Sequence, residues 1–92
     1  MASERLVFRV HALQRMAQRG ILVEDVRQIL ETGEAIEDYA DDFPYPSTLV
    51  LGRIDGRALH VVVATTPAEK IVITVYDPDP ARWEADLKRR KP

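Results

Sequence analysis

The dipeptide Asp55-Gly56, which separates two runs of strand-forming residues, constrains the fold of this chain more than any other feature. Both residue types tolerate positive φ, and such a pair between apolar runs is a strong signal for a two-residue β-hairpin. The turn therefore predicts strands over Thr48–Ile54 and Arg57–Thr65. Counting outward from the turn gives the register, which pairs Arg53 with Ala58 and Leu51 with His60.

The interiors of these two strands are almost continuously apolar, which predicts central strands that are covered on both faces. Alternation predicts an edge strand over Glu34–Tyr39 and a last strand over Lys70–Tyr76. Charged side chains on the edge strand discourage pairing with another molecule. The segment Arg5–Val10 is either a short strand or the lead-in to a helix.

Helical periodicity and end signals predict three helices. Their expected ranges are about Val10–Arg19 closed by Gly20, about Val23–Glu31 followed by Gly33, and a C-terminal helix that begins at Pro80 with Asp79 as its cap. The acidic pair Glu24-Asp25 suits the positive end of the second helix dipole. The predicted fold class is therefore α+β: two N-terminal helices, a four-stranded mainly antiparallel sheet and a C-terminal helix.

The first predicted helix carries two different sets of side chains. His11, Arg15 and Arg19 are spaced four residues apart and form one cationic ridge, called here the ridge. Apolar residues on another side are expected to anchor the helix, namely Val10, Leu13, Met16 and Ala17. The ridge is the best candidate in the sequence for chemistry on a phosphate, and a solvated basic face is the ordinary alternative.

Length and composition limit the classes of protein. The chain has 92 residues, which makes residues 1–92 a single domain, and it has no cysteine and only two histidines. We therefore expect no metal and no cofactor. Because no apolar run is long enough for a signal peptide or a membrane span, we expect a cytoplasmic, bacterial protein with no membrane partner. At this size the core is modest, so a homodimer or another tight partner would help its stability.

Charge is strongly segregated along the chain. The first 23 residues sum to +3, residues 24–42 to −7, and residues 80–92 to +3, within a total of −2. A protein that binds nucleic acid through its overall field is usually basic throughout. The acidic middle therefore argues against broad nonspecific binding to a polyanion, but it leaves room for a local phosphate site near either basic end.

Several motifs spread over the chain occur together. They are His11-Ala12-x-x-Arg15-Met16-x-x-Arg19-Gly20-Ile21, Glu24-Asp25-Val26, Ile36-Glu37-Asp38-Tyr39, Pro44-Tyr45-Pro46-Ser47, Leu59-His60-Val61-Val62-Val63 and Ile73-Thr74-Val75-Tyr76. On these motifs the chain resembles a prokaryotic domain family of unknown function. It departs from that family at Leu22, where a capping serine or threonine is common. The family is similar at fold level to small ribonuclease toxins of RelE and BrnT type. The resemblance implies a RelE-like fold, an RNA substrate and an antitoxin protein as partner.

These residues suggest a metal-independent endoribonuclease of toxin-antitoxin type. His11 and Arg15 from the first helix are expected to meet Thr74 and Tyr76 of the last strand, with His60 arriving from the neighbouring strand. Neutral His11 is the first choice of base for the ribose 2′-hydroxyl, which then attacks phosphorus, while a second group protonates the leaving 5′-oxygen. The catalytic candidates are His11, Arg15, His60 and Tyr76; the substrate-binding candidates are Arg19 and Thr74.

Each candidate also has a structural interpretation. His60 in a valine-rich strand fits a hydrogen-bonded core histidine, Thr74 an ordinary strand residue, and Tyr76 an edge-of-core tyrosine. The ridge arginines have the alternative of ion pairs with the acidic segment. Two other functions therefore stay open: a noncatalytic protein-binding module whose acidic edge, Glu34 to Asp42, meets a basic partner, and a small domain without enzymatic activity.

Overall fold

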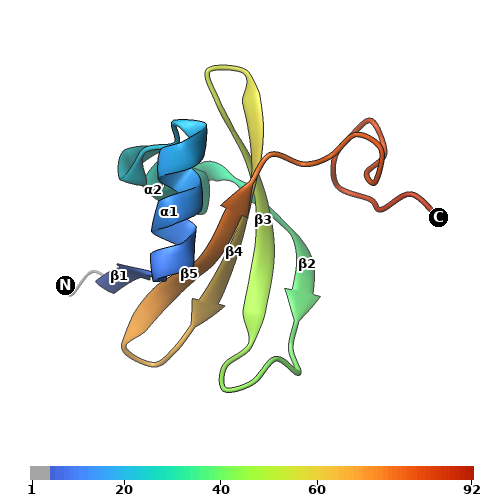
Figure 1. The fold of residues 1–92 in the computed structure, drawn as a ribbon. Helices are drawn as coiled ribbons and strands as arrows, with labels where there is room; N and C mark the ends of the chain where they lie inside the picture. The colour runs from blue at the N-terminus through green and yellow to red at the C-terminus, as the bar shows by residue number, and fades with distance from the viewer. Residues whose placement is uncertain (1–4) are drawn as a thin grey trace.

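A computed structural model describes residues 5–92 as two helices packed on one face of a five-stranded sheet (Figure 1). In chain order, the elements are β1 (Arg5–Phe8), α1 (Val10–Arg19), α2 (Val23–Thr32), β2 (Glu34–Tyr39), β3 (Ser47–Ile54), β4 (Arg57–Thr65) and β5 (Glu69–Tyr76). The α+β class is confirmed. Within the described residues, no helix is long and apolar enough to cross a bilayer.

The sheet has the strand order β1-β5-β4-β3-β2, and β1 runs parallel to β5 while the other pairs are antiparallel. The prediction of a four-stranded sheet was therefore wrong by one strand. The missing strand is the undecided N-terminal segment, where Arg5 pairs with Glu69 and Phe8 with Val72. Four residues carry too little periodicity to identify a strand locally, and this one is defined by a partner far along the chain.

The central hairpin has the predicted register. Arg53 lies opposite Ala58 and Leu51 opposite His60, and the turn residues Asp55 and Gly56 both adopt positive φ, 51° and 82°. The first helix ends at Arg19 as predicted, the second ends at Thr32, one residue later than predicted, and β2 is the edge strand. Coverage of both faces is confirmed within β4, because neighbouring side chains that point in opposite directions, His60 and Val61, are each fully buried.

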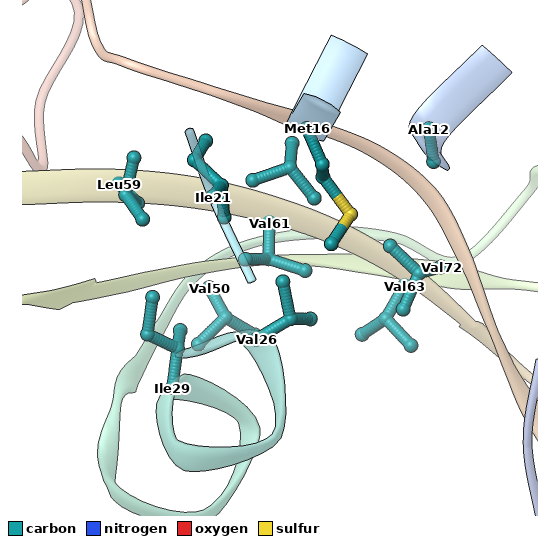
Figure 2. Packing of buried hydrophobic residues seen from close by; sticks show 11 residues of the cluster. Ala12, Met16, Ile21, Val26, Ile29, Val50, Leu59, Val61, Val63 and Val72 are labelled. Atoms are coloured by element: carbon teal, nitrogen blue, oxygen red, sulfur yellow. The ribbon is translucent and has the colours of Figure 1, made fainter. Parts of the chain in front are cut away.

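The helices pack over the face of the sheet that carries Val61, Val63, Val72 and Val75. Met16 of α1 extends toward Val61 within this cluster (Figure 2). The expected anchor of α1 was only partly right. Met16 is buried together with Ala12, whereas Val10 is 67% and Leu13 43% exposed, and Ala17 is exposed as well. The helix is rotated so that the small Ala12 side chain faces the sheet, which allows close approach.

The second helix sits close to β3 because Gly52 has no side chain. A Cβ atom at this position would lie 2.6 Å from Ile29 of α2. Ile29 and Val26 are buried, and Leu30 packs at the edge of the same cluster. The absent serine or threonine cap at Leu22 is compensated by Asp25, whose carboxylate accepts the Leu22 N–H at 2.9 Å.

The predicted C-terminal helix does not form. Residues 79–92, called here the tail, make a chain of turns on the face of the sheet opposite the helices (Figure 1). Asp86 accepts the N–H groups of Lys88 and Arg89 at 2.9 and 3.3 Å, a local arrangement that competes with a helix. Leu87 has a positive φ of 61°, which also interrupts helical geometry. The signals for a helix start were present, but these local bonds and contacts with the sheet override them.

Candidate functional site

The ridge lies on the outer surface of α1. His11 and Arg15 are exposed and line a shallow hollow together with Gln14 and Gln18. Arg19 is half-buried at the end of the helix. The Arg57 hydrogen bonds lower the pKa of Asp77, which lies beyond the end of β5, and the charge of Arg19 adds to this lowering. The ridge therefore runs along the helix and ends beside the last strand.

His60 and Tyr76 lie on the other face of the sheet. They are opposite each other in the β4–β5 pair, and their neighbours Val61 and Val75 point into the helix-covered core. Because side chains alternate along a strand, His60 and Tyr76 point away from the helices, as does Thr74 two residues earlier. The expected convergence of the α1 side chains with these strand residues does not form for His11 and Arg15.

The two strand residues form a directed pair. The Nε2 atom of His60 lies 2.9 Å from the carbonyl oxygen of Leu87 in the tail, and Nδ1 lies 3.2 Å from the hydroxyl of Tyr76. A carbonyl only accepts, so Nε2 carries the proton of the neutral ring. Nδ1 is then an acceptor, and Tyr76 donates its hydroxyl proton to it. The tail thus fixes the tautomer in which His60 is a base toward Tyr76.

Burial sets the protonation states of both groups. Burial lowers the pKa of His60; the Leu87 hydrogen bond and the charge of Glu37 oppose this shift, and the charge of Arg90 adds to it. Burial also raises the pKa of Tyr76. At neutral pH the imidazole is therefore neutral and the phenol keeps its proton.

Tyr76 also lines a pocket of about 310 Å³ at the end of β5, called here the arginine pocket. Its lining residues are Arg19, Tyr76, Asp77, Asp79, Arg82, Trp83 and Arg90. The three guanidinium groups come from α1 and from two turns of the tail. Of the two carboxylates, Asp77 is already engaged by Arg57 through two hydrogen bonds of 2.8 and 2.9 Å, and Asp79 forms a long ion pair of 4.0 Å with Arg82. The pocket therefore offers cationic donors to an anion.

A second network fixes the tail beside this pocket. Arg90 makes two hydrogen bonds of 2.9 and 3.0 Å to Glu37 on β2 and stacks over Trp83 at 4.7 Å. Glu37 also accepts a hydrogen bond from the Tyr39 hydroxyl. The Arg90 hydrogen bond lowers the pKa of Glu37 and burial raises that of Tyr39. Trp83 is buried against the edge of the His60 ring, with centroids 4.5 Å apart.

Sequence reasoning named three of the residues now found together, namely Arg19, His60 and Tyr76. It missed Glu37, Arg82 and Arg90 as members of one site. The segregation of charge carried a usable signal, because the acidic edge strand and the basic tail have opposite signs. Glu37 and Arg90 pair across 53 positions, and Lys88 pairs with Glu34 at 2.9 Å. Among residues 5–92, no three His, Asp or Glu side chains are grouped as a metal site would require.

Comparison with known families identifies most of the chain. Residues 8–77 match the family model described as Domain of unknown function (DUF4258), and the chain belongs to this family. The match includes α1, both histidines and the last strand, and it ends before the tail. No curated protein and no solved structure matches the chain.

Proposed function

We propose that this DUF4258 domain is a metal-independent endoribonuclease of toxin-antitoxin type and that its reaction takes place in the arginine pocket. One observation carries the proposal. The Tyr76 hydroxyl donates a hydrogen bond to the buried, neutral imidazole of His60, and Tyr76 also lines a pocket with three guanidinium groups. A hydroxyl with a base behind it and cations around it matches the needs of phosphodiester cleavage.

In the proposed reaction, Tyr76 and His60 remove a proton in one relay. The ribose 2′-hydroxyl gives its proton to the Tyr76 oxygen while Tyr76 passes its own proton to Nδ1 of His60. The 2′-oxygen forms a bond to phosphorus, and the bond from phosphorus to the 5′-oxygen breaks. The leaving oxygen takes a proton from water, and His60 later returns its proton to solvent. The products are a 2′,3′-cyclic phosphate and a 5′-hydroxyl.

The pocket arginines stabilise the charge that grows on the phosphoryl oxygens. Arg19 and Arg82 supply guanidinium groups whose planar donors suit two oxygens at once. Arg90 is held by Glu37 and keeps the tail in place. Burial lowers the pKa of His60, and the negative charge of Glu37 partly offsets this lowering, which favours the protonated imidazole that forms during the relay.

This assignment revises the roles expected from the sequence. His11 and Arg15 lie away from Tyr76, so the relay has Tyr76 and His60 as its base in place of His11. The toxin-antitoxin role and the likeness of the domain to RelE and BrnT type toxins stay part of the proposal. The expected cellular outcome is arrest of growth on expression. The protein-binding alternative is disfavoured because Lys88 and Arg90 already engage Glu34 and Glu37 on the acidic edge.

The test is cleavage of a labelled single-stranded RNA by the purified protein in excess chelator, with the product ends identified. We expect cyclic phosphate ends and a loss of about 100-fold or more in rate for Tyr76→Phe, which keeps the ring and removes the relay hydroxyl. The matched control is Tyr45→Phe, because Tyr45 is an exposed loop tyrosine far from the relay in sequence. Equal rates for the two variants, or no cleavage by the parent protein, would refute the proposal.

A further inference from the structure

Two side chains of the ridge have no partner in the part of the chain that the structure describes. The side chains of His11 and Arg15 make no hydrogen bond or ion pair with any residue from 5 to 92, although most basic side chains of the tail do. Helix α1 itself contains no acidic residue. Gln14 and Gln18 line the same hollow as these two side chains and add amide donors. The outer surface of α1 is therefore a donor-rich strip that nothing in the described chain occupies.

The strip continues into the arginine pocket. Steps of four residues lead from His11 through Arg15 to Arg19, and Arg19 lines the pocket. Each step advances about 6 Å along the helix axis, close to the separation of neighbouring phosphates in an extended single strand. One cation of the ridge can thus meet one phosphate of a strand whose reacting phosphate lies in the pocket.

From this alignment we infer that the ridge is a phosphate track, which binds the part of a single-stranded RNA that extends out of the pocket. The inference rests on the proposed function and adds a substrate class to it: an extended RNA strand with at least two phosphates beyond the one in the pocket. A flexible strand can follow the helix and also bend one phosphate into a recess, whereas a duplex holds its phosphates on a stiff rod.

The composition of the strip favours phosphate over a protein surface. A helix turns by about 100° per residue, so the exposed Leu13 lies on the opposite flank of α1 from Arg15. The residues that face the track are polar or cationic, and a basic row without carboxylates is the usual footprint of a nucleic-acid backbone. An acidic protein partner on the same helix is an alternative outcome of the test.

Binding is measured by fluorescence anisotropy with a labelled 12-nucleotide RNA whose 2′-oxygens are all methylated, so that it cannot be cleaved. We expect Arg15→Gln to weaken binding about 10-fold and to reduce the slope of log affinity against log salt by about 1. The matched control is Arg53→Gln, which removes one charge from an exposed position on β3 and leaves binding unchanged. The RNA duplex of the same length is expected to bind much more weakly than the single strand.

Cleavage assays separate this inference from the function on which it rests. With a 12-nucleotide substrate, Arg15→Gln is expected to raise KM and leave kcat unchanged, and with a dinucleotide it is expected to change neither. Loss of cleavage in Tyr76→Phe, together with weaker RNA binding in Arg15→Gln, supports both the nuclease and the phosphate track. An RNA that binds through Arg15 but is never cleaved refutes the nuclease and keeps the track. The track is refuted if the Arg15→Gln and Arg53→Gln variants bind the RNA equally well, or if the duplex binds as tightly as the single strand. It is also refuted if only an acidic protein displaces the RNA.

Discussion

The basic residues of α1 and those of the tail carry the same charge but have opposite surroundings. Lys88 and Arg90 of the tail are paired with carboxylates of β2, whereas His11 and Arg15 of α1 have no partner among residues 5–92. Paired cations hold a segment in place, and unpaired cations remain available for a ligand. The sign of a charged segment therefore says little about its role until the position of the opposite charges is known.

The largest expected effect on stability comes from removing the Trp83 side chain, which holds the tail against the sheet. This side chain is 3% exposed and packs on His60 and under Arg90. Trp83→Ala is expected to lower the free energy of unfolding by about 3 to 5 kcal/mol, as for other buried aromatic side chains. Urea unfolding of Leu13→Ala, an exposed apolar position on α1, is the control and is expected to change much less. Similar small losses in both variants would contradict the account of the tail.

The pH dependence of stability tests the buried imidazole under the tail. The pKa of His60 is lowered by burial from an ordinary value of 6.5, so the unfolded chain takes up a proton at a higher pH than the folded one does. This contribution to stability is complete above pH 6.5 and is lost as the pH falls from 6.5 toward the folded pKa, by up to about 1.4 kcal/mol per pH unit.

The measurement is urea unfolding at a series of pH values from 8 to 5. His60→Gln, which removes the titrating group, is expected to flatten this part of the profile even if it lowers stability at every pH. A slope that persists unchanged in His60→Gln would show that another group is responsible.

A smaller effect is expected from the pair that anchors the tail to the edge strand. Glu37→Gln keeps the shape of the side chain and removes its charge, so Arg90 loses its ionic partner. We expect a loss of about 1 kcal/mol in unfolding free energy, since the pair is partly exposed. The Arg90 hydrogen bond lowers the pKa of Glu37 from 4.5, so this contribution is present above pH 4.5 and lost as the pH falls below it. The variant and the parent protein should therefore converge in acid.

The smallest effect is expected on the ridge itself. Arg15→Gln removes a cation with no partner in the described chain, so the free energy of unfolding is expected to change by no more than about 0.5 kcal/mol. Thermal unfolding of the variant checks this. A clear loss of stability would mean that Arg15 serves the fold and would remove the contrast between the two basic regions.

Local rules were sufficient for the middle of the chain. The Asp55-Gly56 turn predicted its hairpin and register because a two-residue turn fixes both strands at once. Local rules were insufficient at the two ends of the chain. Strand β1 forms because it pairs with β5, and the tail takes its shape from its contacts with β2 and β4. The candidate site followed the same division. His60, Tyr76 and Arg19 were named from local pattern, while Glu37 and Arg90 depend on contacts between distant segments.

The arginine pocket crosses the boundary of the family match. Arg19, Tyr76 and Asp77 lie inside residues 8–77, whereas Arg82, Trp83 and Arg90 lie beyond them. One wall therefore lies within the residues that match the family, and the other lies beyond them. If the pocket binds nucleotides as proposed, members with different C-terminal residues can acquire different preferences for their targets while the helices and the sheet stay as they are.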